Sequence, residues 1–212
     1  MKRLIIFLLP LFIIGCHSWG VKGSGNIKEE ERNVAEFTKI DISGYFKVNI
    51  KSGKTTSLKI ITDDNFLPLI KTEVKDQTLK ISTKKKLDSK KPIRIEISTP
   101  HLIKLECSGA NKLSVTGIDE DMFYLDVSGA CEVRIYGSVN TFKAEMSGAT
   151  KLDAENLHAK KVNLVVSGAS KAKVYATSDI NASGSGASYI EYYGNPAKVN
   201  SNVSGASKIK KK

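Results

Sequence analysis

The sequence contains few of the residues that build catalytic and metal centres. Its 212 residues include three histidines, three cysteines and one tryptophan, and aromatic residues make up 7% of the chain. The histidines, His17, His101 and His158, lie far apart without metal-ligand spacing, so we expect no metal site and no cofactor. No serine stands in a nucleophile motif. The lone Gly23-Ser24-Gly25 neither follows a strand nor opens a helix, which argues against a nucleotide-binding loop.

Long hydrophobic runs are also scarce, and the one near the N-terminus is too short to span a membrane. Residues 4–14 form an apolar run of eleven residues behind Lys2 and Arg3. A membrane-spanning helix needs about 20 such residues. The run is typical of a signal peptide, which we assign to residues 1–15.

The segment after this run, Ile13-Ile14-Gly15-Cys16, resembles a bacterial lipobox. The resemblance implies cleavage before Cys16 and a diacylglyceryl group on its sulfur, with residues 16–23 as a linker. The expected partner is then a membrane, reached through the lipid anchor. The expected location is the cell envelope, at the periplasmic or surface side of the outer membrane. An ordinary buried cysteine behind a leader is the alternative.

The tripeptide Ser-Gly-Ala occurs six times in the second half of the chain. Its glycines are Gly109, Gly129, Gly148, Gly168, Gly186 and Gly205. Successive copies are 18 to 20 residues apart, which is the period of a solenoid repeat. Apolar residues alternate with polar ones on both sides of each copy, as in Phe123, Leu125 and Val127. This alternation is the period of a β-strand with one buried face.

Each repeat is too short for a βαβ unit, which takes roughly thirty residues, and fits one coil of a parallel β-helix. We therefore predict an all-β, right-handed parallel β-helix-like solenoid with about 19–20 residues per coil. Glycine can adopt the positive φ of a tight corner, alanine can stack between coils, and the serine hydroxyl can hydrogen-bond the bend. A second turn in each unit is expected at Gly117, Gly137, Asn156 and Gly194.

Residues 24–100 contain alternating strands but no regular repeat. We predict less regular coils or a strand-rich cap here, continuing into six regular coils over residues 101–212, so that residues 24–212 form one domain. A separate N-terminal domain ending near Pro100 is the alternative. The charge of the C-terminal Lys208 to Lys212 is expected to protect the last sheet edge, unless this segment is a frayed tail.

Three features together resemble the bacterial head GIN domain family. They are Gly-Ser-Gly-Asn-Ile at residues 23–27, the stretch from Phe37 to Gly44, and the Ser-Gly-Ala series. The resemblance covers roughly residues 24–212. It implies a β-helix-like exported protein, often a lipoprotein, from a family that carries an adhesin label. It supplies no catalytic residues.

Two cysteines remain besides Cys16. In the repeat register Cys107 aligns with Val127, and Cys131 lies four residues further along, beyond the corner. A disulfide needs Cα atoms within about 7 Å of each other. We therefore predict two free thiols, with Cys107 buried as a small hydrophobic residue.

Two outward rows of charged residues flank the predicted corners, and the first is acidic. Glu106, Asp126 and Glu145 occupy one position before successive corners, which places their carboxylates roughly 5 Å apart. Such a row can bind a hard cation such as Ca²⁺ or serve a polysaccharide lyase. We favour a solvated ion-pair ladder with Lys104 and Lys143.

The second row follows the corners and is mostly basic. It contains Lys112, Glu132, Lys151, Lys171, Tyr189 and Lys208. Lysine beside tyrosine on a flat sheet can bind a glycan or another envelope protein, although an ordinary wet surface is the favoured alternative. The net charge of +11, or +9 without Lys2 and Arg3, fits a soluble lysine-rich surface. Anionic lipids or glycans are the second interpretation of this charge, and nucleic acid is not expected because no recognition motif is present.

These observations predict a lipid-anchored, non-enzymatic protein of the bacterial cell envelope that acts in adhesion or as a scaffold. One alternative is a carbohydrate-active β-helix enzyme, either a lyase or a hydrolase. Another is a module that binds anionic lipid or glycan. The enzyme would require a concave cleft with grouped acids and Lys or Arg.

Overall fold

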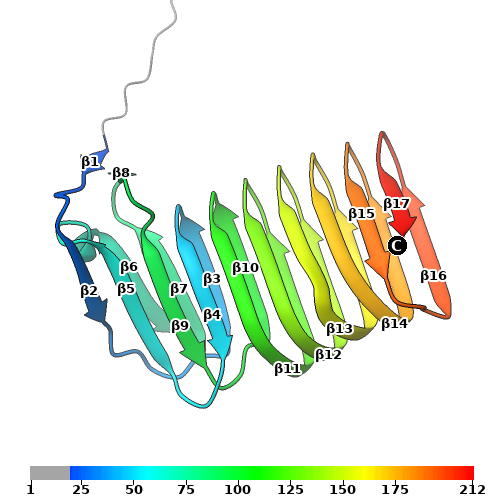
Figure 1. The fold of residues 1–212 in the computed structure, drawn as a ribbon, viewed down its shortest axis with the longest axis horizontal. Coiled ribbons are helices and arrows are strands. Elements are labelled where there is room, and N and C mark those ends of the chain that lie inside the picture. Colours follow the sequence, from blue (N-terminus) through cyan, green and yellow to red (C-terminus); the bar gives the residue numbers. More distant parts are fainter. Residues whose placement is uncertain (1–19) are drawn as a thin grey trace, which may run out of the picture.

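Stacked parallel strands form a β-solenoid in the computed structural model, which describes residues 20–212 (Figure 1). The predicted all-β solenoid of stacked coils is confirmed. The predicted signal peptide and Cys16 lie outside the described residues. In the part of the chain that is described, no helix is long and apolar enough to span a lipid bilayer.

The regular coils are built from short strands and from four long strands of 14 to 16 residues, each of which turns around one end of the solenoid cross-section. These strands are β10 (Lys104–Gly109), β11 (Lys112–Val127), β12 (Glu132–Met146), β13 (Lys151–Val166), β14 (Lys171–Gly184), β15 (Tyr189–Tyr193), β16 (Lys198–Val203) and β17 (Lys208–Lys211). Each of β11 to β14 begins after one corner and ends at the next. The predicted second turn is therefore a bend inside a continuous strand, with positive φ at Gly117 and Gly137 beside shifts in the strand register.

The corners stack through main-chain hydrogen bonds between neighbouring coils. The Ala130 amide donates to the Gly109 carbonyl at 2.7 Å, and the Ala149 amide donates to the Gly129 carbonyl at 2.8 Å. The side chain that follows each of the first five Ser-Gly-Ala copies turns inward and is buried: Asn111, Cys131, Thr150, Ser170 and Ser188. The corners therefore enclose a column of mostly polar side chains.

This column makes the side-chain hydrogen bonds that the tripeptide serines were expected to make. Thr150 Oγ1 donates to Ser170 Oγ at 2.9 Å, and Ser170 Oγ lies 3.1 Å from the Gly148 carbonyl. Among the tripeptide serines, all of which are described, only the Ser167 hydroxyl bonds a main-chain carbonyl, that of Met146. The predicted role of the serine hydroxyl is thus wrong for most corners. The side chain of the residue after alanine points into the corner instead.

The N-terminal half supplies one coil and a cap. Its elements are β1 (Val21–Lys22), β2 (Ile27–Glu31), β3 (Lys39–Gly44), β4 (Lys47–Ser52), β5 (Ser57–Asp63), the 3₁₀ turn η1 (Leu67–Leu69), β6 (Ile70–Lys75), β7 (Thr78–Thr83), β8 (Leu87–Asp88) and β9 (Arg94–Thr99). β3 lies between β7 and β10, and β4 lies between β9 and β11. Strands β3 and β4 thus form a coil in register with the later ones, and residues 57–99 fold behind it.

Antiparallel pairing makes this end of the solenoid a strand-rich cap. β5 pairs antiparallel with both β2 and β9, and β6 pairs antiparallel with β7. β1 and β8 form a separate short parallel pair. One hydrophobic core extends from Phe37 in the cap to Ile190 near the C-terminus. The cap therefore shares its core with the regular coils.

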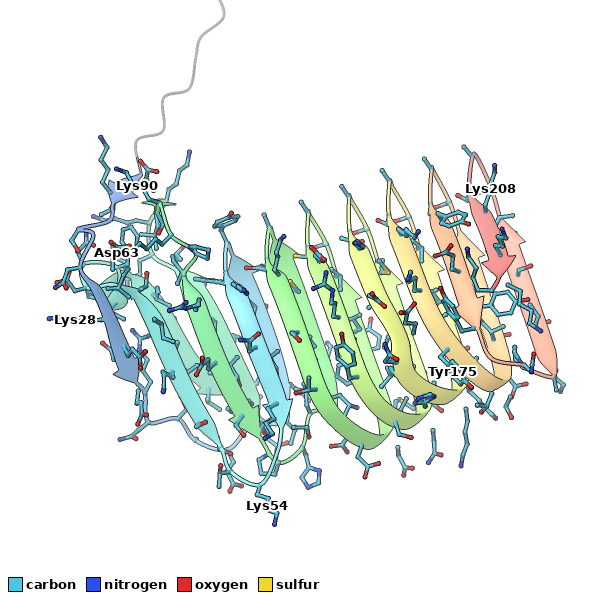
Figure 2. All side chains as sticks on the ribbon, in the orientation of Figure 1. Lys28, Lys54, Asp63, Lys90, Tyr175 and Lys208 are labelled. Carbon is cyan, nitrogen blue, oxygen red and sulfur yellow. The ribbon has the colours of Figure 1, made fainter. Side chains whose placement is uncertain are left out.

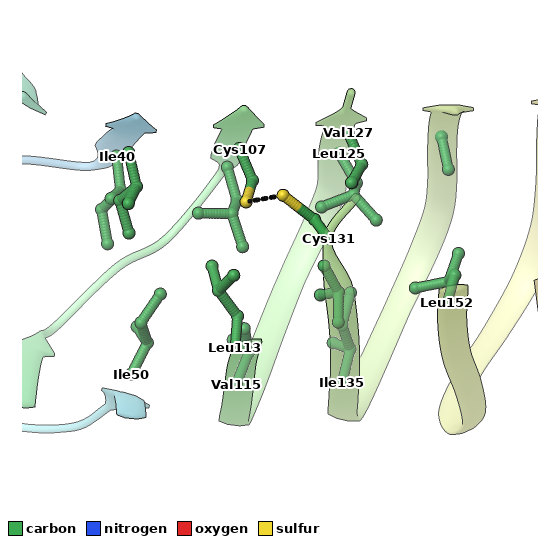
Figure 3. Close-up of a cluster of buried hydrophobic side chains, with 14 of the residues drawn as sticks. Ile40, Ile50, Cys107, Leu113, Val115, Leu125, Val127, Cys131, Ile135 and Leu152 are labelled. Atoms are coloured by element: carbon green, nitrogen blue, oxygen red, sulfur yellow. Dashed lines mark hydrogen bonds between the residues drawn. The ribbon is translucent and has the colours of Figure 1, made fainter. Parts of the chain in front are cut away.

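The core is a stack of inward-facing side chains between the two faces of the coils (Figure 3). Leu113 and Val115 come from the strand after a corner, and Leu125 and Val127 from the strand before the next one; all four are at most 4% exposed. The alternation in the sequence places these side chains inside, since successive residues of a strand point to opposite faces.

The C-terminal lysines form a strand rather than a frayed tail. Lys208 to Lys211 make up β17, which pairs with β15. Lys212 Nζ lies 3.3 Å from Glu191. The last coil leaves its inner face open, since Val199 and Val203 are 45% and 46% exposed.

Candidate functional site: a lysine-lined groove at the corners

Both predicted rows run along the solenoid, because equivalent residues of neighbouring coils lie beside one another. The acidic row lies on the face before the corners, and the basic row lies on the face after them. Glu106 lies opposite Asp126, and Asp126 opposite Glu145. Asp41 lies opposite Glu106 and begins this row. In the basic row Lys112, Glu132 and Lys151 are successive neighbours. The two rows do not converge on a common site, because the corner separates them.

The acidic row is partly neutralised at one position. Lys104 Nζ lies 2.9 Å from Glu106 Oε1 and 5.2 Å from the centre of the Tyr124 ring. Burial, Glu145 and Glu106 raise the pKa of Asp126. Burial and a hydrogen bond with Glu145 raise the pKa of Tyr124 to about 12. Asp126 therefore ionises less readily than a free aspartate, because it is partly buried and acidic neighbours flank it.

The expected ladder is consequently a single ion pair rather than a continuous series. In the described chain, Lys143 forms no ion pair with the row. Residues 20–212 also contain no group of three or more His, Cys, Asp and Glu side chains placed to hold a metal ion. Within these residues the row thus lacks the clustering of ligands that a cation site would use.

A groove of about 520 Å³ lies beside the basic row, at the corners of the first coils. Ser43-Gly44 forms a further corner in register with the six tripeptides, and Tyr45 stands where the others carry alanine. The Tyr45 side chain is 66% exposed. It lines the groove together with the small Ala110, Ala130 and Ala149. The groove exists because one large side chain is followed by three small ones.

The groove carries a surplus of positive charge. Lys47, Lys112 and Lys151 line it, and Glu132 is its acidic residue. Glu132 lies 2.6 Å from Arg134, 3.5 Å from Lys112 and 4.0 Å from Lys151. Three cations thus share one carboxylate, while the Lys112 side chain remains 74% exposed. An anionic group that enters the groove would meet ammonium groups that are not fully paired.

The other three residues of the basic row, Lys171, Tyr189 and Lys208, belong to the C-terminal coils. Lys171 Nζ lies 5.0 Å from the centre of the Tyr189 ring and 3.3 Å from Glu191. Burial alone would raise the pKa of Glu191, but hydrogen bonds from Lys171 and Lys212 outweigh burial and lower it. These residues bind the last coils to one another and do not line the groove. Figure 2 shows Lys208 at the corner side of these coils and Tyr175 at the bend side.

A second hollow, of about 580 Å³, lies in the cap and resembles the cleft that an enzyme would require. Glu31, Glu96, Lys59 and Arg32 line it. Lys59 pairs in register with Glu31 on one side and Glu96 on the other, so opposite charges alternate across three strands. The Arg32 guanidinium donates to the Leu67 and Ile70 carbonyls, both at 2.7 Å. Lys59 Nζ also lies 3.7 Å from Glu29 in β2, so Arg32 and Lys59 both make contacts between segments of the cap.

Three residues of the basic face were missed by sequence reasoning. They are Tyr45 and Lys47 in the groove, and Arg94, which continues the row beyond Lys47. The signal was present, because Ser43-Gly44 repeats the first two residues of the tripeptide. Their place beside Lys112 depends on β4 lying against β11, which no local pattern indicates.

Comparison with protein families finds one match that covers most of the chain. Residues 36–196 match the family described as "Putative auto-transporter adhesin, head GIN domain". Among curated proteins no significant match was found. The family description names adhesion and no enzymatic activity.

Solved structures share the fold. A "putative adhesin" from Bacteroides fragilis is 24% identical with a TM-score of 0.73, covering 91% of this chain and 100% of that one. A "putative adhesin" from Parabacteroides merdae is 18% identical with a TM-score of 0.59, covering 91% and 98%. A "Putative lipid binding protein" from Parabacteroides distasonis is 18% identical with a TM-score of 0.53, covering 91% and 99%. At these identities the similarity shows the fold alone.

Proposed function

The chain belongs to the head GIN domain family, and on that premise we propose that it is a non-enzymatic adhesion protein of the cell envelope that binds an anionic glycan in its lysine-lined groove. The observation that carries the proposal is that one groove is lined by an exposed aromatic ring, three alanines and three lysines. Adhesion requires binding without turnover, and this set offers contact area and charge.

The occupant is inferred from the chemistry of the groove wall. Tyr45 presents a ring against which an apolar sugar face can pack, and its hydroxyl group remains available for hydrogen bonding. Lys47, Lys112 and Lys151 follow one another along the coils, with Glu132 between the last two. Adjacent coils are spaced by about 4.8 Å, so the lysines recur along the groove. A linear polymer with repeating carboxylate or sulfate groups complements this arrangement.

Removal of two groove lysines is expected to weaken glycan binding roughly 10- to 100-fold, because each ion pair between a lysine and the glycan contributes about 1 kcal/mol or more. The variant is Lys112→Gln with Lys151→Gln. Binding is measured by calorimetry against a sulfated glycan and a polyuronate, with neutral dextran as the blank. The affinity of the wild type should also fall steeply with salt.

A matched variant, Lys160→Gln with Lys161→Gln, removes the same net charge from the bend of β13, outside the groove. It should retain the affinity of the wild type. Equal losses in both variants would show that binding follows overall charge and not the groove. Binding to vesicles with anionic headgroups, without binding to either glycan, would replace the glycan by a lipid as the ligand. Cleavage of either polymer would overturn the non-enzymatic assignment.

The proposed attachment to the envelope is a lipid on Cys16, supported by the apolar leader and the Gly15-Cys16 pair. Several lipid methylene groups, at about 0.8 kcal/mol each, would provide stable anchoring. We expect a fatty-acid analogue to label the wild type in its bacterial host and to leave Cys16→Ala unlabelled and released from the membrane fraction. A wild-type protein that takes up no label would contradict the anchor.

A further inference from the structure

Two thiols meet at the corner between the first two regular coils. Cys107 lies near the end of β10, and Cys131 follows the next corner, yet their Sγ atoms are 2.9 Å apart (Figure 3). Both side chains are buried and unbridged. The predicted register, Cys107 opposite Val127, is confirmed, and the two thiols are free as predicted. The inference that this register keeps the sulfurs apart is wrong.

The corner geometry explains the approach. Cys107 stands two residues before Gly109, Cys131 stands two residues after Gly129, and both point inward. Cys107 therefore comes from the strand before one corner, Cys131 comes from the strand after the next corner, and the two side chains meet inside the stacked corners. The same two positions one coil further along hold Val127 and Thr150. Within residues 20–212, only this coil pair places two thiols at these positions.

We propose that Cys107 and Cys131 are an oxidation site at which an intramolecular disulfide joins two successive coils. The separation of 2.9 Å exceeds the roughly 2.05 Å of a disulfide bond by less than 1 Å. A small rotation of the side chains closes this difference. The two residues are 24 positions apart in the chain, so the bond would close a loop of moderate length.

The oxidant is a disulfide, either a small one such as glutathione disulfide or that of a thiol oxidase. The Cys131 thiolate attacks one donor sulfur, breaks the donor disulfide and expels one donor thiolate, which leaves a mixed disulfide on Cys131. The Cys107 thiol then loses its proton, attacks the Cys131 sulfur and expels the second donor thiolate. Two protein thiols and one donor disulfide thus become one protein disulfide and two donor thiols.

The surroundings assign the attacking role to Cys131. The Cys107 thiol donates a hydrogen bond to Cys131 Sγ, and this bond lowers the pKa of Cys131 and raises that of Cys107. The Asn111 amide nitrogen, 3.9 Å from Cys131 Sγ, adds to the lowering. Cys131 is 2% exposed but is among the residues that line the groove of about 520 Å³, so the groove is the side from which a donor disulfide would approach.

The test compares the full-length chain before and after treatment with excess glutathione disulfide. Trypsin releases Cys107 in residues 105–112 and Cys131 in residues 113–134, so a bond between them appears as a linked peptide pair that reductant separates. We expect this pair after oxidation, together with the loss of both thiols to alkylation in denaturant. The melting temperature should rise by roughly 5–10 °C relative to the reduced protein.

The control replaces the thiols by the residues of the next coil, as Cys107→Val with Cys131→Thr. This variant should fold, as judged by circular dichroism, and its melting temperature should not respond to the redox state. Two results would overturn the proposal. One is a folded wild type whose two thiols stay open to alkylation after oxidation, and the other is a linkage found only between chains or with glutathione.

Discussion

Replacing Gly148 by alanine is expected to lower the free energy of unfolding by about 4 kcal/mol. Gly148 has a φ of +84°, and an added Cβ would lie 2.5 Å from the carbonyl oxygen of Gly129 in the neighbouring coil. The left-handed conformation alone costs roughly 1–2 kcal/mol for a residue with a Cβ. The added Cβ would collide with the main chain of Gly129, which cannot move aside as a side chain could, so the two coils must separate and weaken the hydrogen bond from Ala149 to Gly129. Urea denaturation measures the loss.

Gly25 provides a control that separates conformational strain from collision. Its φ is +86°, close to that of Gly148, but no atom lies within 4 Å of an added Cβ. Gly25→Ala should therefore cost only the conformational part, about 1–2 kcal/mol. The difference between the two variants measures the close approach of the coils. If both variants lost the same stability, the corners would not be in the tight contact that the structure describes.

The regular coils could be predicted from the sequence because their register depends on a repeated corner. Once Gly109 and Gly129 are aligned, Glu106 must lie beside Asp126, and Lys112 beside Glu132. Strand alternation then decides which side chains point inward. Both steps use only local spacing, which is why the outward rows followed correctly from residue numbers.

Features that depend on contacts between distant segments could not be predicted. Strands β3 and β4 lie against β10 and β11, although residues 57–99 separate them in the chain and fold on the other side of β3 and β4. The groove therefore joins Tyr45 to alanines that lie far along the chain. The alignment of neighbouring strands also failed to predict the contact between Cys107 and Cys131. Such an alignment does not describe two side chains that meet across a corner.

The junction between the cap coil and the regular coils depends on Asn111. Its side chain is 1% exposed. Asn111 Oδ1 accepts a hydrogen bond from the Phe46 amide at 2.8 Å, and its Nδ2 donates to the Ser108 carbonyl at 2.6 Å. One amide group thus satisfies main-chain groups of two corners. Later coils have cysteine, threonine or serine at this position, and these side chains are too short to bridge two corners in this way.

Asn111→Ala is therefore expected to cost about 3 kcal/mol, since a buried donor and a carbonyl lose their partner at once and each costs roughly 1–3 kcal/mol. Ser188→Ala changes the equivalent position near the C-terminus. Ser188 Oγ bonds only the Ser207 hydroxyl, at 3.0 Å, within the described chain, so about 1 kcal/mol or less should be lost. Hydrogen exchange should show faster exchange at Phe46 in Asn111→Ala alone. A stable Asn111→Ala variant with a protected Phe46 amide would contradict this role. It would mean that main-chain hydrogen bonds alone join the two coils and that the Asn111 side chain only occupies space in the corner.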